Sequence, residues 1–190
     1  MTSTSLESEM SAIPQPDAEL IQQCLRGQRS AFQVLYRRYQ GPVRSTLFQL
    51  CGAAELDDLV QEVFLRAWKG LPKFRQSAQF STWLYRIAWN VASDRRHALG
   101  KARSHPLSPP LTLATGQADL TQLHYQDLVQ RGLQALSLEH RAVIVLHDLE
   151  DLPQQEIASI LNIPKGTVKS RLHHARSALR TFLQTEGVQL

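Results

Sequence analysis

A single long interruption separates two stretches of helical pattern in this chain. Apolar residues recur three and four positions apart from about residue 17 to residue 97, and again from Leu120 to Phe182. The interruption, residues 100–120, contains three prolines and two glycines, a composition that prevents a stable helix or a central strand. The sequence therefore predicts an all-α fold of two small helical domains joined by an extended linker.

The boundaries of these domains follow from composition. The chain has 190 residues, of which 43% are hydrophobic, enough for two small domains that each have a core. Residues 1–16 are polar, rich in Ser and Thr and broken by two prolines, so we expect a disordered tail. We expect the first domain at 17–98, the linker at 99–120, the second domain at 121–185 and a C-terminal tail at 186–190.

Residues 153–180 have the pattern of a helix-turn-helix. Asn162 tolerates the left-handed conformation that such a turn needs, and Pro164 presets the backbone angle for a new first helical position. The expected buried positions are Ile157, Ala158 and Leu161 on the first helix and Val168, Leu172 and Ala175 on the second. This pattern is typical of DNA-reading helix pairs.

The second helix of this pair carries positive charge only. From Lys165 to Arg180 there are five Lys or Arg residues and no Asp or Glu. An exposed face of this kind attracts phosphates and can donate hydrogen bonds to base edges. The alternative is an ordinary solvated basic helix, but the turn residues and the small Ala158 at the helix crossing favour DNA binding.

The segment 55–68 predicts an amphipathic helix with an acidic face. Its buried stripe is Leu56, Leu59, Val60, Val63, Phe64, Ala67 and Trp68, and its polar face holds Asp57, Asp58, Gln61 and Glu62. Acids near a helix N-terminus complement the helix dipole, and for Glu55 and Asp57 this suffices. It explains Glu62 poorly. We therefore interpret the face as a docking surface for a basic protein partner.

The segment 73–96 interleaves aromatic and cationic residues. They are Phe74, Phe80, Trp83, Tyr85 and Trp89 with Lys73, Arg75, Arg86, Arg95 and Arg96. Rings stack on unpaired bases while cations hold the strand, at roughly 1 to 3 kcal/mol per stacked base. Some of these rings share a stripe with Leu84 and Ala88 and belong to a core. We expect Ser81 to cap a helix through Arg96, and the loop 73–79 to touch an extruded base.

At this point the motifs carry a family resemblance. DDLVQEVFLRAW, FSTWLYRIAWNVASDRR and LSLEHRAVIVLHDLEDLPQQEIASILNIPKGTVKSRLHHAR, in this order, resemble bacterial extracytoplasmic function (ECF) sigma factors over residues 17–183. The resemblance implies a promoter-specificity subunit that binds core RNA polymerase. Its first domain would recognise and melt the minus-ten element, and its second would read the minus-thirty-five duplex. It also implies a probable anti-sigma partner.

The resemblance assigns a role to each matching position. Polymerase binding falls to Asp57, Asp58, Gln61 and Glu62. Contact with the minus-ten DNA falls to Lys73, Phe74, Arg75, Gln76, Ser77, Ala78, Trp83, Arg86 and Asn90. Contact with the minus-thirty-five duplex falls to Lys165, Gly166, Thr167, Lys169, Ser170, Arg171, His173, His174 and Arg176. For Arg171 and Arg176, domain packing is an equal alternative.

Other functions are less well supported by the sequence. The chain lacks a phosphate-cradling glycine loop, HExxH and GxSxG, and a local ion pair accounts for Asp94, so we expect no enzyme and no cofactor. Adjacent His173 and His174 point about 100 degrees apart on a helix, which makes them a poor metal chelate. His140 and His147 are expected at the surface or in caps.

Three further expectations concern the cysteines, the cellular location and the class of DNA-binding protein. Cys24 and Cys51 lack CxxC spacing and are expected as buried free thiols. No apolar run is long enough to cross a bilayer and the N-terminus does not resemble a secretion signal, so we expect a cytoplasmic protein with no membrane insertion. A stand-alone helix-turn-helix repressor or activator is the rival binding hypothesis. It would need a dimerisation helix or ligand domain.

Overall fold

A computed structural model describes residues 15–75, 78–101 and 120–188, and in these ranges the chain is helical without strands. The first half contains α1 (Asp17–Leu25), α2 (Arg29–Cys51), α3 (Leu56–Gly70) and α4 (Phe80–Lys101), with the short turn η1 (Leu71–Lys73) after α3. The second half contains α5 (Leu120–Ala135), α6 (Leu138–Ile144), the π-helical turn η2 (Val145–Leu149), α7 (Gln154–Leu161) and α8 (Lys165–Thr185). The all-α prediction is confirmed.

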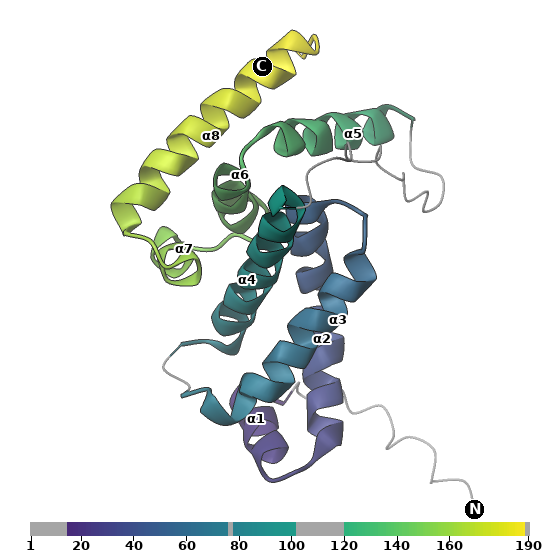
Figure 1. Cartoon of the computed structure of the whole chain (residues 1–190), viewed down its shortest axis with the longest axis vertical. Coiled ribbons are helices and arrows are strands. Elements are labelled where there is room, and N and C mark those ends of the chain that lie inside the picture. Colours follow the sequence, from purple (N-terminus) through teal and green to yellow (C-terminus); the bar gives the residue numbers. More distant parts are fainter. Residues whose placement is uncertain (1–14, 76–77, 102–119, 189–190) are drawn as a thin grey trace, which may run out of the picture.

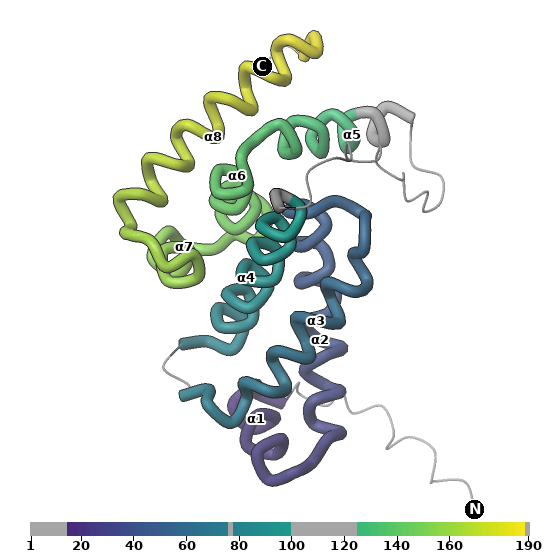
Figure 2. The backbone as a smooth tube through the Cα atoms, in the orientation of Figure 1, coloured from purple at the N-terminus to yellow at the C-terminus, as the bar shows by residue number. Residues whose placement is uncertain are grey.

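The long helices α2, α3 and α4 pack side by side, and α1 folds back against the start of α2 (Figures 1 and 2). Asp17, in the first turn of α1, accepts hydrogen bonds from Arg38 and Tyr39 of α2 and so fixes the short helix. The predicted stripe of α3 is buried from Leu56 to Ala67, but Trp68 is 37% exposed. Its ring packs edge-on against Phe32 of α2 at 4.9 Å between centroids, at the rim of the helix pair.

The second half folds as the sequence predicts, with α7 and α8 as the helix-turn-helix. Asn162 adopts the left-handed conformation, with φ 54° and ψ 48°, and the six predicted core positions of the two helices are buried. Helix α8 begins at Lys165, so Pro164 is its N-cap residue and not its first helical residue. Helix α8 then runs back across α6 and α5 (Figure 1).

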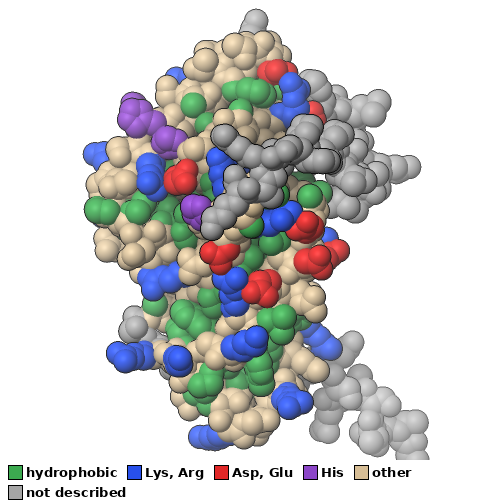
Figure 3. Space-filling view, in the orientation of Figure 1, with side chains coloured by type: hydrophobic (Ala, Val, Ile, Leu, Met, Phe, Trp, Pro, Cys, Tyr) green, Lys and Arg blue, Asp and Glu red, His purple; other side chains and the backbone are tan. Residues whose placement is uncertain are grey.

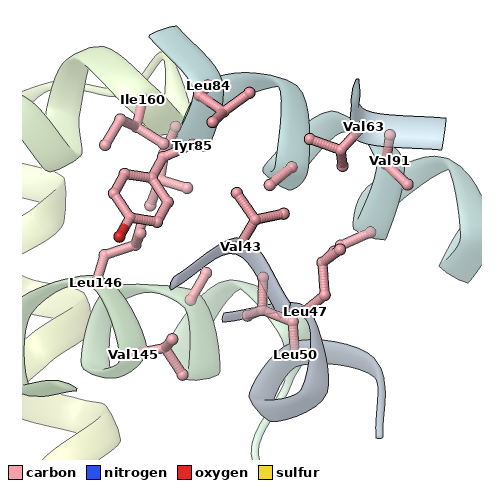
Figure 4. Close-up of a cluster of buried hydrophobic side chains, with 14 of the residues drawn as sticks. Val43, Leu47, Leu50, Val63, Leu84, Tyr85, Val91, Val145, Leu146 and Ile160 are labelled. Carbon is pink, nitrogen blue, oxygen red and sulfur yellow. The ribbon is translucent and has the colours of Figure 1, made fainter. Parts of the chain in front are cut away.

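The two halves do not have separate cores, contrary to the expectation. Buried side chains from α2, α4, α6, η2 and α7 form a continuous cluster. Figure 4 shows Tyr85 of α4 beside Leu146 and Ile160, which belong to the second half. Short helices cannot bury all of their apolar side chains against α8, so the remainder packs against the first half.

A buried arginine joins the halves at one end of this shared core. Arg141 of α6 is 7% exposed and donates to the backbone oxygens of Gln134 and Leu136 at 2.8 and 3.2 Å and of Leu50 at 2.6 Å. Leu50 lies in the last turn of α2, whose carbonyls have no partner within the helix. Arg141 therefore caps α2 from the other half of the chain. Burial lowers the pKa of its guanidinium.

Candidate nucleic-acid and polymerase interfaces

The polar face of α3 is where the sequence places it. Asp57, Asp58 and Gln61 are exposed and Glu62 is half-buried. Two of the acids have cationic neighbours of their own: Asp57 pairs with Arg44 of α2, and Glu62 pairs with Arg66 at 2.7 Å. The i,i+4 pair accounts for Glu62 within its own helix, so only Asp58 and Gln61 of this face are without a described partner.

Arg66 also joins α3 to α4. Its Nη1 lies 2.7 Å from a carboxylate oxygen of Asp94, and hydrogen bonds to Asp94 and Glu62 raise the pKa of the guanidinium. Asp94 is thus ion-paired, as expected from the sequence. The expected pair was a local one, however, whereas the partner Arg66 lies on α3. Arg66 therefore holds Glu62 and Asp94 in defined positions.

A groove between α2 and α3 adjoins the acidic face, and the sequence did not predict it. It has a volume of about 670 Å³, and its polar lining includes Gln61 and the ion-paired Asp57 and Arg44. Its other lining side chains are mainly apolar, among them Phe32, Tyr36, Phe64, Leu65 and Trp68. Leu65 is 45% exposed and Tyr36 37%. Phe32 and Tyr36 stand four residues apart on α2, a pattern that could have indicated a second aromatic stripe.

The aromatic residues around the loop 73–79 form a packed cluster. Phe74 lies 4.8 Å from Trp83 and 6.0 Å from Phe80, between ring centroids. Phe80 is 4% exposed, and a methyl group on Gly70 would come within 3.1 Å of the Trp83 ring. These packed rings therefore hold the start of the loop against α4. Helix α4 begins at Phe80, so Ser81 lies inside the helix and does not cap it.

The polar candidates of this region lie around the cluster. Lys73, Arg75, Ala78, Arg86 and Asn90 are exposed, whereas Gln76 and Ser77 lie outside the described residues. Arg86 donates to the backbone oxygen of Ser159 in α7, and to the Ser159 hydroxyl at 2.9 Å. One cation expected on DNA is therefore bound to the helix-turn-helix in this structure.

The basic face of α8 is open to solvent. Lys165, Gly166, Lys169, Ser170, His173 and His174 are exposed, and Thr167 and Arg171 are half-buried. The two imidazole rings lie 5.5 Å apart between centroids, in an edge-to-face arrangement. A methyl group on Gly166 would meet no atom within 4 Å, so packing within the chain does not require glycine here.

Arg176 differs from the other basic residues of α8. Its Nε donates to Asp148 of η2 at 3.0 Å, and His147 binds the same carboxylate at 2.9 Å. Burial opposes the ionisation of Asp148, but Arg176 and His147 outweigh it and lower the pKa of the carboxyl group. Of the two alternatives for Arg176, this contact supports domain packing.

Charge is unevenly distributed over the molecule. In Figure 3, acidic side chains gather midway along the visible face, while the lower part shows hydrophobic side chains bordered by Lys and Arg. Histidines project at the upper left, on the side of α8. Acidic side chains and histidines thus gather on different parts of the visible face.

Comparison with known proteins identifies the family of the chain. The models of sigma-70 region 2 and sigma-70 region 4 match residues 35–101 and 126–179. The ECF RNA polymerase sigma-E factor of Escherichia coli K12 is 32% identical over 180 residues, covering 88% of this chain and 94% of its own length. The chain belongs to the ECF sigma factor family. The sigma-E factor of Haemophilus influenzae is 29% identical over the same share of this sigma factor.

Solved structures agree with the fold of this sigma factor. CnrH in complex with the cytosolic domain of CnrY has a TM-score of 0.68 and 26% identity, covering 89% of this chain and 97% of that one. The sigma factor RpoE of Bartonella quintana, in complex with the anti-sigma factor NepR, has a TM-score of 0.70 and 23% identity, covering 80% and 96%. The rival hypothesis of a stand-alone repressor or activator is not favoured.

The structure shows the environment of both cysteines and of His140 in this sigma factor. Cys24 and Cys51 are free, Cys24 buried as expected and Cys51 half-buried. Burial raises the pKa of the Cys51 thiol to about 11, which disfavours the reactive thiolate at neutral pH. His140 follows Ser137, the N-cap of α6, and its backbone N–H donates to the Ser137 hydroxyl.

The described ranges of this sigma factor contain no cluster of His, Cys, Asp and Glu side chains suited to a metal ion. None of the helices described there combines the length and apolar character needed to span a membrane.

Glu150 and Arg141 are the contact residues that sequence reasoning missed. Glu150 follows η2 and accepts hydrogen bonds from Thr46 of α2 at 2.8 Å and Tyr85 of α4 at 2.6 Å. The signal for Arg141 was a lone cation within an apolar helix. The carboxylate of Glu150 had no such signal, because its partners lie 104 and 65 residues away.

Proposed function

We propose that this sigma factor binds core RNA polymerase and directs initiation at particular promoters, through binding alone and in the cytoplasm where polymerase acts. The observation that carries the proposal is the presence of two separate surfaces, a largely apolar groove between α2 and α3 beside the exposed acid Asp58, and an open face of α8 that carries Lys and Arg but no acid. A protein that only read duplex DNA would need the second surface and not the first.

The groove and the acidic face of α3 together form the docking surface for polymerase. Asp57 and Gln61 line the groove, and Asp58 is exposed beside them. Apolar anchors surrounded by charge are the usual composition of a strong interface: the anchor contributes affinity and the charges orient the approach. The partner we infer is a basic helical segment that inserts an apolar side chain between Tyr36 and Leu65.

The loop 73–79 and the exposed side of α4 bind the melted minus-ten strand. Lys73, Arg75 and Arg86 supply positive charge for the strand backbone, and Asn90 supplies an amide that can both donate to and accept from a base edge. The packed rings of Phe74, Phe80 and Trp83 make the floor of this site rigid. Gln76 and Ser77 complete the set by resemblance.

The N-terminal half of α8 reads the minus-thirty-five duplex. None of its exposed side chains is acidic, as a helix that enters the negatively charged major groove requires. Lys169 and Ser170 are suited to base edges and Lys165 to phosphates. Residues 17–98 and 121–185 are thus the two working domains, and the segment between them links the two DNA sites.

We include an anti-sigma protein among the partners. The solved relatives were captured with partner proteins, one of them named an anti-sigma factor. A protein that regulates by blocking would bind the same exposed groove or the same basic face.

Reconstituted transcription tests the proposal. Core polymerase with this sigma factor should initiate at new positions on genomic DNA, and core polymerase alone should not. The control is the same reaction with Lys169→Ala, which should shift or weaken the choice of upstream sequence without abolishing initiation. If a duplex is bound tightly by a dimer of this protein and polymerase is unaffected, the chain is a stand-alone regulator.

Reversing one acidic charge tests the docking surface. Asp58→Lys should weaken core binding about tenfold or more, because a cation then faces the basic partner. Competition binding with labelled sigma factor measures the change. Glu19→Lys is the matched control, since Glu19 is also an exposed acid in the first turn of a helix. Equal core affinity of the two variants contradicts the assignment.

A further inference from the structure

The first half of α8 carries its fixed charges at the edges of its exposed face and not at the centre. Val168, Leu172 and Ala175 are buried and define the inner side of the helix. Successive helix residues are about 100 degrees apart, so the residues opposite this side follow from the sequence. From Lys165 to Ser177 the opposite side holds Gly166, Ser170, His173, His174 and Ser177, all exposed, whereas Lys165, Lys169 and Arg176 lie along one edge and Arg171 along the other.

The charge at this centre is therefore set by two histidines. Both side chains are exposed, and their rings lie 5.5 Å apart between centroids. Figure 3 shows histidines projecting on the side of α8. A neutral imidazole both donates and accepts a hydrogen bond, whereas an imidazolium carries one positive charge and donates from both nitrogens. Histidine is the side chain that ordinarily changes charge between pH 5 and 8, so the face can gain two positive charges over this range.

The elements that pack on α8 engage their own charged groups elsewhere. Each such acid and histidine has another partner within the described ranges: Glu139 of α6 interacts with Arg171 and Arg96, His140 with Ser137, Asp148 of η2 with His147 and Arg176, Glu156 of α7 with Thr82, and Asp127 of α5 with Arg131. No ion pair to an acid of the described chain holds His173 or His174. The anion that suits this pair is therefore a phosphate from outside the chain.

Phosphates favour the protonated pair because they offset repulsion within α8. Lys169 lies one turn before His173, and like charges at this spacing repel each other. Two imidazolium rings 5.5 Å apart repel each other as well. Phosphates of a duplex beside α8 attract all of these charges, so DNA binding and proton uptake favour each other.

We propose that the contact of α8 with duplex DNA is proton-linked: binding takes up protons at His173 and His174 and strengthens as the pH falls from 8 to 6. The inference rests on the proposed function, which places this face of α8 on the minus-thirty-five duplex. The complex holds more protons than the free chain, so affinity is gained as the pH falls and lost as the pH rises. Phosphate contacts carry no sequence information, so the gain should be the same for all duplex sequences.

Duplex binding by the full-length chain at two pH values tests the proposal. The probe is a labelled duplex of randomised sequence, used at constant ionic strength. We expect binding to be about tenfold tighter at pH 6 than at pH 8. The slope of log affinity against log salt concentration should also be steeper at pH 6, by roughly 0.9 for each histidine that becomes charged on a phosphate.

Paired substitutions assign the response to these two residues. His173→Gln with His174→Gln keeps polar side chains but removes the titration, so this variant should bind as the wild type does at pH 8 and should not respond to pH. His173→Arg with His174→Arg supplies permanent charge and should bind tightly at both pH values. His97→Gln is the matched control, because His97 is an exposed histidine of α4, and this variant should keep the full response.

Thermal melting at both pH values verifies that each variant is folded, and all of the substituted side chains are exposed. A pH response that survives in the double glutamine variant belongs to other groups and overturns the proposal. A wild type that binds the duplex equally well at pH 6 and pH 8, or at neither, overturns it too.

The two proposals fail separately, because proton linkage needs only that α8 bind duplex DNA. A pH response that the double glutamine variant abolishes supports proton linkage even if polymerase is never redirected. Redirected polymerase with a duplex affinity that does not change with pH supports the proposed function and removes proton linkage.

Discussion

Gly166 is a glycine that the packing of α8 does not require. It lies in the first turn of the helix, exposed, where an added methyl group meets no atom. Glycine costs helix stability relative to alanine, and nothing in the chain compensates for it here. If α8 reads duplex DNA as proposed, we expect a DNA backbone to approach closely at this position.

Replacing this glycine separates stability from binding. Gly166→Ala should stabilise the fold by about 0.5 to 1 kcal/mol in denaturant unfolding and weaken binding of the upstream duplex at saturating core polymerase. Unchanged or tighter duplex binding by Gly166→Ala would exclude a close backbone approach at this position.

At the scale of elements, a glycine of the opposite kind controls how α5 and α8 cross. A methyl group on Gly132 would lie 2.5 Å from Leu179 and 3.0 Å from Phe182, both on α8. Arg131 reinforces the crossing, with its guanidinium 5.8 Å from the Phe182 ring and bonded to Glu186 at 2.9 Å. The close approach fixes the direction of α8 relative to the rest of the second half.

Gly132→Ala should therefore destabilise the protein, by about 1 to 3 kcal/mol, because the two apolar side chains of α8 must shift. Denaturant unfolding measures the change, and Gly166→Ala, where an added methyl group meets no atom, should have the opposite sign. A neutral result for Gly132→Ala would mean that α5 and α8 separate at little cost.

Helix content and most buried stripes could be predicted because they depend on local periodicity. The left-handed Asn162 and the core of α7 and α8 follow from neighbouring residues alone. Helix ends and rims were less predictable: Ser81 lies inside α4 and Trp68 is partly exposed. Both depend on how neighbouring helices pack, and the periodicity of a single segment gives no information about that packing. The roles of individual surface residues stay predictions.

At the scale of the whole molecule, the shared core was the main surprise. The pattern of the sequence shows which side chains are buried but not which half of the chain buries them. Arg141 on Leu50 and Glu150 on Thr46 join residues 91 and 104 positions apart. Such contacts leave no periodic trace, and for this reason the candidate groove and the contacts between the two halves emerged only from the structure.

Arg141→Leu tests whether the two halves unfold together. The wild type should unfold in a single calorimetric transition, since one hydrophobic cluster spans both halves. Loss of the guanidinium leaves three backbone carbonyls without their donor, at about 1 to 3 kcal/mol for each buried group. We expect a lower melting temperature and two resolved transitions. A single transition at the wild-type temperature would show that Arg141 does not couple the halves.

The bridge that Arg66 makes to Glu62 and Asp94 has a kinetic consequence for assembly. Side chains already immobilised lose little rotational freedom on meeting a partner, so the face is preorganised. Glu62 is neutralised within the chain by Arg66, so Asp58 is left to attract a basic partner at long range. The rate constant for association with polymerase should consequently fall only modestly as ionic strength rises. The lifetime of the complex should depend on apolar burial in the groove.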